Sequence, residues 1–329
     1  MTVGIRDVAR AAGVSTATVS RALGGGPVSQ ALREQVEAAV RATGYRPNLS
    51  ARRLRSQDTQ TIGLIVADIR NPFFTAVSRA VEDAAYQAGM RVILCNTDED
   101  PEREAMYLRL MQEERVTGVI FAPTRATAES LDDLGFPAVL IDRTGPPGRF
   151  DGVVLDNVAA ATALVDHLVA QGFSRIGGLF GSTSSTAAER QAGYEAAMRR
   201  HGLAPASRTA LPNAAAAEAA AARWLGADDR PEALILSNGL ILMGTLRAAR
   251  ALSLRIPEDL ALAGFDNEPW TELVEPGLTV IEQPVAEIGA QAMSLLFERI
   301  RSPDQPVRKV VLSGRPVLRG STGVLRGAA

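Results

Sequence analysis

The sequence predicts an α/β protein in which a small helical N-terminal domain precedes a larger body with two parallel-sheet subdomains. Three amphipathic helix patterns occupy residues 5–43, and short apolar runs then alternate with helix-length segments from Thr61 onward. This alternation restarts after Asp156. Strands that alternate with helices are typical of parallel sheets. Two such runs indicate two doubly wound subdomains, with a ligand cleft outside the carboxyl ends of their strands.

Length and composition fit a globular protein of two or three domains, with 329 residues of which 46% are hydrophobic. We find no apolar run of the ~18 residues that a membrane span needs, and no apolar core of a secretory signal. The single cysteine, Cys95, cannot form an internal disulfide, which fits a reducing cytoplasm. With His167 and His201 as its only histidines, the chain offers little material for a metal site, and we expect no cofactor.

Charge is distributed unevenly, although the net charge is only −2. Residues 1–58 contain nine arginines and four acidic residues, a formal charge of +5, so the remainder carries −7. A basic N-terminal domain on an acidic body is expected when only that domain meets nucleic-acid phosphates.

Residues 5–24 are the part of the N-terminal domain that points to DNA. They form two short helix patterns joined at Gly13, which suits a left-handed turn residue, and Ser15 can cap the second helix. The side of that helix opposite its apolar residues carries Thr16, Ala17, Ser20 and Arg21. A short polar face of this kind is typical of a helix that enters the major groove. An ordinary helical hairpin on an enzyme surface is the alternative.

A third helix and a short basic segment follow. Residues 30–43, preceded by Ser29 and followed by Gly44, have helical apolar spacing. Asn48 can cap a further helix of about two turns, too short to be stable alone in water. That segment sets Leu54 among arginines, so DNA could hold it with the leucine wedged into a minor-groove step. The alternative is a plain charged linker.

The elements of the body are predicted in order from period-two and period-3.6 apolar patterns. Expected strands cover residues 62–66, 91–95, 118–121, 138–141, 175–180, 233–236 and 260–263. Expected helices cover residues 73–88, 101–114, 158–171, 187–201, 214–224 and 242–252.

Seven spaced segments carry a more specific signal: RDVARAAGVS (6–15), TVSR (18–21), GYRPN (44–48), IGLIV (62–66), NPFF (71–74), NTD (96–98) and GFDN (264–267). Together, and in this order, they resemble the lactose-repressor (LacI/GalR) family of bacterial transcription regulators. The resemblance implies a helix-turn-helix domain at 1–46, a hinge helix and linker at 47–58, and an effector-binding and dimerisation domain at 59–329. It further implies that residues 60–155 and 284–312 form the N-subdomain, and residues 156–283 and 313–326 the C-subdomain, of a periplasmic-binding-protein-like body.

For the N-terminal domain, the resemblance implies a homodimer on a near-palindromic double-stranded operator. It assigns base reading to Thr16, Ala17 and Arg21, and phosphate contacts to Ser15, Thr18 and Ser20. Arg21 is the side chain suited to guanine. In the hinge it assigns DNA contacts to Asn48, Arg52 and Leu54.

For the body, the resemblance implies a sugar-like effector held by Asn71, Phe74, Arg143, Asp156, Arg190, Asn238, Asp266 and Trp270. Carboxylates accept from sugar hydroxyls, arginines form forked bonds, and an aromatic ring covers an apolar sugar face. Alternatives stay open for several residues: Asn71 can simply cap the next helix, one of Phe73 and Phe74 should be ordinary core, and Trp270 can lie at an interface. A sugar or sugar acid suits the two arginines; a purine or a phosphosugar is not excluded.

The expected function is therefore a cytoplasmic, sequence-specific regulator of transcription, a repressor, whose operator affinity a small molecule changes. A sugar-binding or sugar-processing protein with a vestigial N-terminal domain is the first rival, and a DNA-binding structural protein without an effector is the second. No catalytic constellation favours an enzyme: residues 182–185 offer hydroxyls, yet neither histidine has an evident place beside them. Whether the effector releases or tightens DNA binding stays open.

Overall fold

The computed structural model describes residues 3–24, 26–45, 59–128 and 130–323. The chain divides into two compact units, the head (Met1–Thr59) and the body (Gln60–Ala329). The expected hinge contacts Asn48, Arg52 and Leu54 lie outside the described residues.

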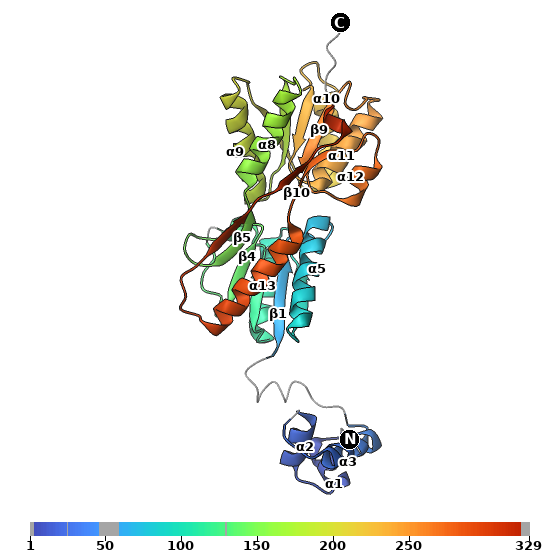
Figure 1. The fold of residues 1–329 in the computed structure, drawn as a ribbon, viewed down its shortest axis with the longest axis vertical. Helices are drawn as coiled ribbons and strands as arrows, with labels where there is room; N and C mark the ends of the chain where they lie inside the picture. The colour runs from blue at the N-terminus through green and yellow to red at the C-terminus, as the bar shows by residue number, and fades with distance from the viewer. Residues whose placement is uncertain (1–2, 25, 46–58, 129, 324–329) are drawn as a thin grey trace. The chain divides into compact units, whose positions relative to one another are not determined.

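The head consists of helices α1 (Ile5–Ala11), α2 (Thr16–Leu23) and α3 (Gln30–Thr43) around one small apolar core (Figure 1). Each helix turns its apolar stripe inward, as its spacing predicts. The buried core residues are Val8, Ala9, Ala12, Val19, Ala22, Val36 and Ala39.

The head helices begin and end where the sequence predicts. The Ser15 hydroxyl accepts a hydrogen bond from the Thr18 N–H at 3.1 Å, and Ser29 caps α3 in the same way. Gly13 has φ +61°, in the left-handed region that favours glycine. Gly4 has no side chain with which to cap α1. The Asp7 carboxylate instead accepts from the Gly4 N–H at 2.9 Å, which satisfies one donor at this helix start.

The first sheet of the body has the strand order β11-β5-β4-β3-β1-β2, with all neighbours parallel. Helices α5 (Pro72–Gln87) and α13 (Val285–Arg301) cover one face, and α6 (Pro101–Glu113) covers the other. The strands are β1 (Thr61–Val66), β2 (Arg91–Asn96), β3 (Gly118–Phe121), β4 (Ala138–Ile141), β5 (Asp151–Leu155) and β11 (Lys309–Leu312). A short helix, α7 (Arg125–Ala128), follows β3.

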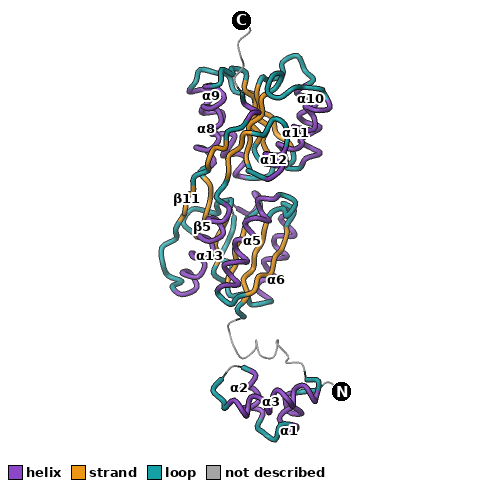
Figure 2. The backbone as a smooth tube through the Cα atoms, turned by 45° about the vertical axis from the view of Figure 1, so that its right-hand side comes forward, coloured by secondary structure: helices purple, strands orange, loops and turns teal. Residues whose placement is uncertain are grey.

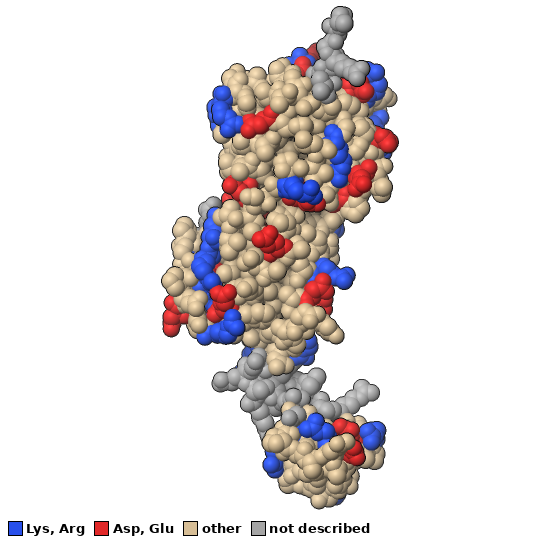
Figure 3. All heavy atoms as spheres, in the orientation of Figure 1, with Lys and Arg blue, Asp and Glu red and all other residues tan. Residues whose placement is uncertain are grey.

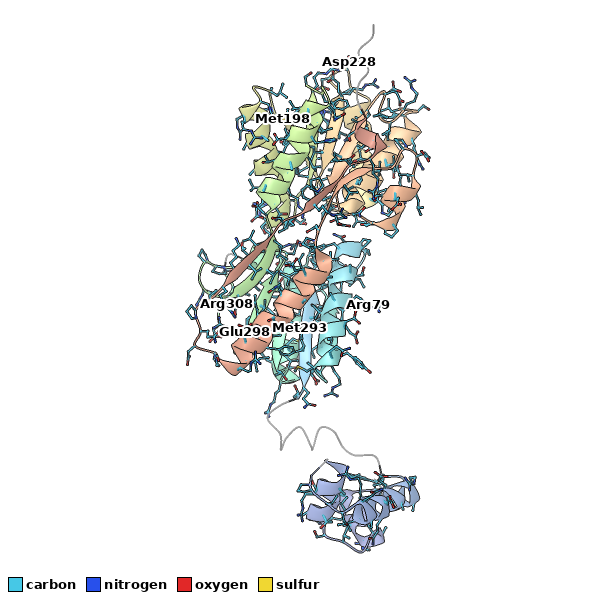
Figure 4. All side chains as sticks on the ribbon, viewed as in Figure 1. Arg79, Met198, Asp228, Met293, Glu298 and Arg308 are labelled. Carbon is cyan, nitrogen blue, oxygen red and sulfur yellow. The ribbon has the colours of Figure 1, made fainter. Side chains whose placement is uncertain are left out.

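Strand β1 is buried on both faces, which explains its uninterrupted apolar run. Ile62 and Leu64 pack with α5 and α13, whereas Ile65 packs with Met111 of α6. Met293 of α13 belongs to the first of these cores. Near the far end of α13, Glu298 pairs with Arg308 at 2.6 Å and ties the helix to the segment before β11 (Figure 4).

The second sheet has the strand order β12-β10-β9-β8-β6-β7, parallel except for the antiparallel β10–β12 pair. Helices α8 (Asn157–Ala170) and α9 (Ser185–Arg200) cover one face, and α10 (Ala214–Leu225) and α11 (Gly239–Ala251) cover the other. The strands are β6 (Ile176–Gly181), β7 (Ala206–Ala210), β8 (Ala233–Leu236), β9 (Ala261–Phe265), β10 (Thr279–Glu282) and β12 (Arg315–Val317). Helix α12 (Pro269–Leu273) and a 3-10 turn at Gly320–Thr322 complete the described chain.

Within the described residues, the chain passes between the two sheets at three places: from β5 to α8, from β10 to α13, and from β11 to β12 (Figures 1 and 2). Strands β5 and β11 pair in parallel, so two of these crossings start side by side. The body therefore has two subdomains, each built on one mainly parallel sheet with helices on both faces, as the alternating pattern predicts (Figure 1). In the described part of the chain, no helix combines the length and apolar character that crossing a membrane requires.

Candidate functional site

A cavity lies at the carboxyl ends of the parallel strands, between the two sheets. It encloses about 520 Å³ including its open mouth, within the range of small-molecule sites. The first sheet and its helices contribute Asp68, Asn71, Phe73, Phe74, Glu99, Asp142 and Arg143. The second sheet and its helices contribute Ser184, Thr186, Ala187, Arg190, Pro212, Ser237, Asn238 and Asp266. Gln283 comes from the β10–α13 crossing. Its walls thus come from both sheets.

Six of the side chains expected at the effector site line this cavity: Asn71, Phe74, Arg143, Arg190, Asn238 and Asp266. The two asparagines also cap helices. Asn71 accepts from the Phe73 N–H at 3.1 Å, and Asn238 accepts from the Ile241 N–H at 2.8 Å. Phe73 and Phe74 both line the cavity, edge to face at 5.1 Å, and both belong to the core. Capping, packing and cavity lining are therefore combined in the same side chains.

Arg143 is buried among acidic and carbonyl oxygens, and its Nε makes no hydrogen bond within the described part of the chain. Its guanidinium forms a forked pair with Glu99, in which Nη1 lies 2.8 Å from Oε2 and Nη2 donates to Oε1. Nη1 also donates to the Pro123 carbonyl at 2.9 Å, and Nε lies 3.3 Å from an Asp142 oxygen. Burial alone would lower the pKa of Arg143, but the Glu99 carboxylate reverses this and raises it. Burial raises the pKa of Asp142.

Arg190 projects from α9 and is held on three sides. Its Nε donates to the Asn157 amide oxygen at 2.8 Å and its Nη1 to the Ser237 carbonyl at 2.5 Å. The guanidinium carbon lies 4.0 Å from the centre of the Phe265 ring, a cation–π contact. Burial lowers the pKa of Arg190, against the opposing effect of the Asp266 and Asp142 carboxylates.

Asp266, at the end of β9, joins three parts of the cavity wall. Its Oδ2 accepts from the Gly239 N–H at 2.9 Å, at the start of α11. Its Oδ1 accepts from Gln283 Nε2 at 2.7 Å, on the β10–α13 crossing. The carboxylate is thus oriented before any ligand arrives, which lowers the entropy cost of binding.

Three of the lining carboxylates sit on left-handed backbone. The φ angle is +61° at Glu99, +64° at Asp142 and +76° at Asp266. Non-glycine residues adopt this region at a cost of about 1–3 kcal/mol. Strained residues of this kind cluster at functional sites, which supports a ligand-binding role for the cavity.

Asp156 and Trp270, also expected at the effector site, lie outside this lining. Asp156 caps α8 by accepting from the Ala159 N–H at 2.9 Å. Trp270 is partly buried against the second-sheet core and donates its Nε1 hydrogen to the Glu268 carboxylate. The other Glu268 oxygen occupies the space that a side chain at Gly239 would need, since a Cβ there would lie 2.3 Å from it.

Several lining residues escaped the sequence analysis, above all Asp68, Glu99, Asp142 and Gln283. Their positions in the sequence could have identified them. Each of these residues follows a strand of a parallel sheet by one to three positions, and ligands of such folds bind outside the carboxyl ends of the strands. Across the described residues, no group of three or more His, Cys, Asp or Glu is placed to hold a metal ion.

On the head, α2 presents the expected polar face to solvent. Ser15, Thr16, Ala17 and Arg21 are exposed, and Thr18 and Ser20 are partly exposed. Arg10 and Arg41 lie near acidic neighbours, whereas Arg21, among the described residues, bonds only to the Ala17 carbonyl, through Nε at 3.5 Å. Figure 3 shows basic side chains on the side of the head that faces the viewer. Exposed arginine on a short polar helix is suited to reading base edges.

Two family models match the chain. One, described as bacterial regulatory proteins of the lacI family, matches residues 4–48. The other, described as a periplasmic binding protein-like domain, matches residues 165–322.

Named relatives and solved structures extend over nearly the whole chain. The chain is 35% identical over 329 residues to the HTH-type transcriptional regulator PtxS of Pseudomonas plecoglossicida, covering 98% of this chain and 96% of the relative. It is 33% identical to the ribose operon repressor of Halalkalibacterium halodurans, covering 97% and 96%. A lac repressor dimer bound to operator and the anti-inducer ONPF superposes with a TM-score of 0.84 at 25% identity, covering 98% of this chain and all of that one. A CelR–cellobiose complex superposes at 0.73 and 25% identity, covering 97% and 99%.

Proposed function

This chain belongs to the lacI family of bacterial regulatory proteins, and we propose that it binds a near-palindromic operator as a homodimer under the control of a sugar-like effector. The family resemblance of the sequence is confirmed. The chain is a DNA-binding transcription regulator rather than an enzyme, as its named relatives are. Because its relatives include repressors, the direction of regulation that we propose is repression, carried out in the cytoplasm where the chromosome lies.

The observation that carries the effector proposal is the cavity between the sheets. It combines preoriented carboxylates, three amides, buried guanidiniums and a pair of phenylalanine rings. Sugar hydroxyls both donate and accept, so they match such a mixed lining, and an aromatic ring covers an apolar sugar face. The solved CelR structure contains cellobiose, and a named relative is a ribose operon repressor. We assign effector contacts to Asn71, Phe74, Arg143, Arg190, Asn238 and Asp266.

For the DNA side, we assign base reading to Thr16, Ala17 and Arg21, and phosphate contacts to Ser15, Thr18 and Ser20. Phosphate contacts fix the register of a protein on DNA, while base contacts specify the sequence. Residues 1–46 then act as the DNA-binding domain, residues 47–58 as hinge and linker, with Asn48, Arg52 and Leu54 on the DNA, and residues 59–329 as the effector and dimerisation domain. The likeness of nearly the whole chain to an operator-bound lac repressor dimer supports this division.

The switch we propose uses the three crossings between the sheets. A ligand that binds residues of both sheets favours one angle between them. A change in that angle moves the first sheet of each protomer relative to its second sheet. Effector and operator are then coupled because each prefers one of the two arrangements.

Fluorescence anisotropy on the full chain tests this function. Duplexes with palindromes from the DNA upstream of the gene, and scrambled duplexes of equal composition, are titrated across salt concentrations with and without a sugar panel. We expect sequence-specific binding that weakens steeply with salt and shifts with at least one sugar. Binding without sequence preference would favour a sugar-binding protein with a vestigial head. Specific binding indifferent to every small molecule would leave the DNA role and remove the switch.

A further inference from the structure

We propose that Glu99 gives the cavity a preference for neutral polyhydroxyl molecules over anionic ones such as sugar acids and sugar phosphates. The inference rests on the proposed function, since it concerns the effector of the same cavity. Glu99 becomes a specificity-determining residue that acts through its pairing with Arg143.

The charge of the lining disfavours an anion. Four carboxylates line the cavity against two guanidiniums: Asp68, Glu99, Asp142 and Asp266 against Arg143 and Arg190. Asp68 is paired with Arg70 at 2.8 Å, so three carboxylates still oppose two cations. Even a protonated Asp142 leaves no net positive charge for an anionic ligand. Like charges brought together at a desolvated site cost several kcal/mol, which is a device for rejecting wrong partners.

The terminal fork of Arg143, formed by Nη1 and Nη2, is already occupied by a carboxylate. A carboxylate or phosphate is recognised best by a forked pair of guanidinium N–H groups, and Glu99 occupies that fork. The side chain of Arg143 is 3% exposed, and its third nitrogen faces Asp142. To pair with this fork, an anionic ligand would have to displace the Glu99 carboxylate. Glu99 would then remain beside the ligand without its arginine partner.

Arg190 does not replace Arg143 as an anion-binding group. Its Nε–H is committed to Asn157 and one Nη1 hydrogen to Ser237, while its guanidinium packs on the Phe265 ring. The Asp266 and Asp142 carboxylates already act on its charge, which reduces its attraction for an anion. The neighbouring acceptors on Asp142, Asp266 and Asn238 suit hydroxyl hydrogens.

The loop that carries Glu99 is anchored, so this pairing is built into the site. Asp98 lies 2.6 Å from the Arg103 guanidinium and 3.2 Å from that of Arg70. Asp100 caps α6 through the N–H groups of Glu102 and Arg103. Glu99 thus sits between two fixed neighbours, on left-handed backbone, and its carboxylate meets an arginine that lies 44 positions further along the chain.

Isothermal titration calorimetry on the full chain, at constant ionic strength, tests the proposal. The probes are matched pairs: D-glucose with D-gluconate, D-galactose with D-galacturonate, and D-ribose with D-ribose 5-phosphate. For at least one pair, we expect the neutral member to bind wild type at least about tenfold more tightly than its anionic partner. Glu99→Gln frees one side of the Arg143 fork and should reduce that ratio about tenfold or more. Glu102→Gln, an exposed change on the neighbouring helix α6, should keep the wild-type ratio.

A wild-type preference for the anion, an unchanged ratio in Glu99→Gln, or binding of no neutral probe would each overturn the inference. The wild-type ratio needs no variant, so the test survives if Glu99→Gln fails to fold. Operator binding by wild type, measured without sugars, distinguishes failure of this inference from failure of the proposed function. Specific operator binding with an anion preference removes the inference and keeps the function, whereas absent operator binding removes the proposed function while the sugar preference is still measured.

Discussion

Replacing Asp266 by asparagine should loosen the cavity wall by a predictable amount. Both carboxylate oxygens accept hydrogen bonds, from the Gly239 N–H and from Gln283 Nε2. An amide offers one oxygen and one NH₂ group, so one of these donors would face another donor. Asp266 is 5% exposed and Gln283 7% exposed, which leaves little access for water to compensate. One lost charge-assisted bond with an unsatisfied buried donor costs about 1–3 kcal/mol of unfolding free energy.

Urea unfolding followed by tryptophan fluorescence measures this loss, because Trp224 and Trp270 both lie in the second-sheet layer. Asp228→Asn is the matched control, since Asp228 is exposed at the outer end of that layer (Figure 4). Adding Gln283→Glu to Asp266→Asn reverses the direction of one hydrogen bond and should recover part of the loss. An unfolding free energy equal to that of wild type, or an equal loss in Asp228→Asn, would refute the hydrogen-bond reasoning.

Three further outcomes are expected. Arg21→Ala should reduce discrimination between operator and scrambled DNA by about 1–3 kcal/mol, measured by anisotropy; equal discrimination would exclude base reading by Arg21. Gly13→Ala should lower the unfolding free energy of the head by about 1–2 kcal/mol, measured by circular dichroism, because an added Cβ meets no atom within 4 Å and only the left-handed φ resists it; an unchanged melt would contradict this. Burial raises the pKa of Glu268, so the folded state holds its proton more tightly and the associated stability is lost as pH rises through the folded pKa. Glu268→Gln should therefore gain stability relative to wild type as pH rises above the ordinary pKa range of a glutamate, and a pH-independent difference in urea melts would count against a raised pKa at Glu268.

Sequence patterns predict most of the body because its strands are buried on both faces and its helices are amphipathic. The predicted strands at 118–121, 138–141 and 233–236 coincide with β3, β4 and β8, and most other predicted elements differ from the structure by one or two positions. The same patterns predict no element at the interior strands β5 and β10, at the edge strands β7, β11 and β12, or at helices α7, α12 and α13. β7 and β12 each pair on one side only, so their sequences, ASRTA and RPV, need no apolar run. Pro316 is tolerated in β12 because an edge strand has unpaired N–H positions.

The cavity is only partly predictable, for a different physical reason. Asn71, Arg190 and Asp266 match family motifs, so their side chains could be named from the sequence. Glu99 matters because of what it meets in space, and nothing local to it specifies Arg143, 44 positions further along the chain, as its partner. Burial and pairing arise from long-range packing, which a single sequence records only through the order of its strands.

Reciprocal coupling between the cavity and the operator is the most direct test of the central claim. The operator Kd is measured with and without a saturating sugar, and the sugar Kd is measured with and without saturating operator duplex. We predict that the two ratios are equal and differ from one, because a shared pair of body arrangements links the two sites. Tight binding of both ligands with ratios of one would contradict effector control of this regulator.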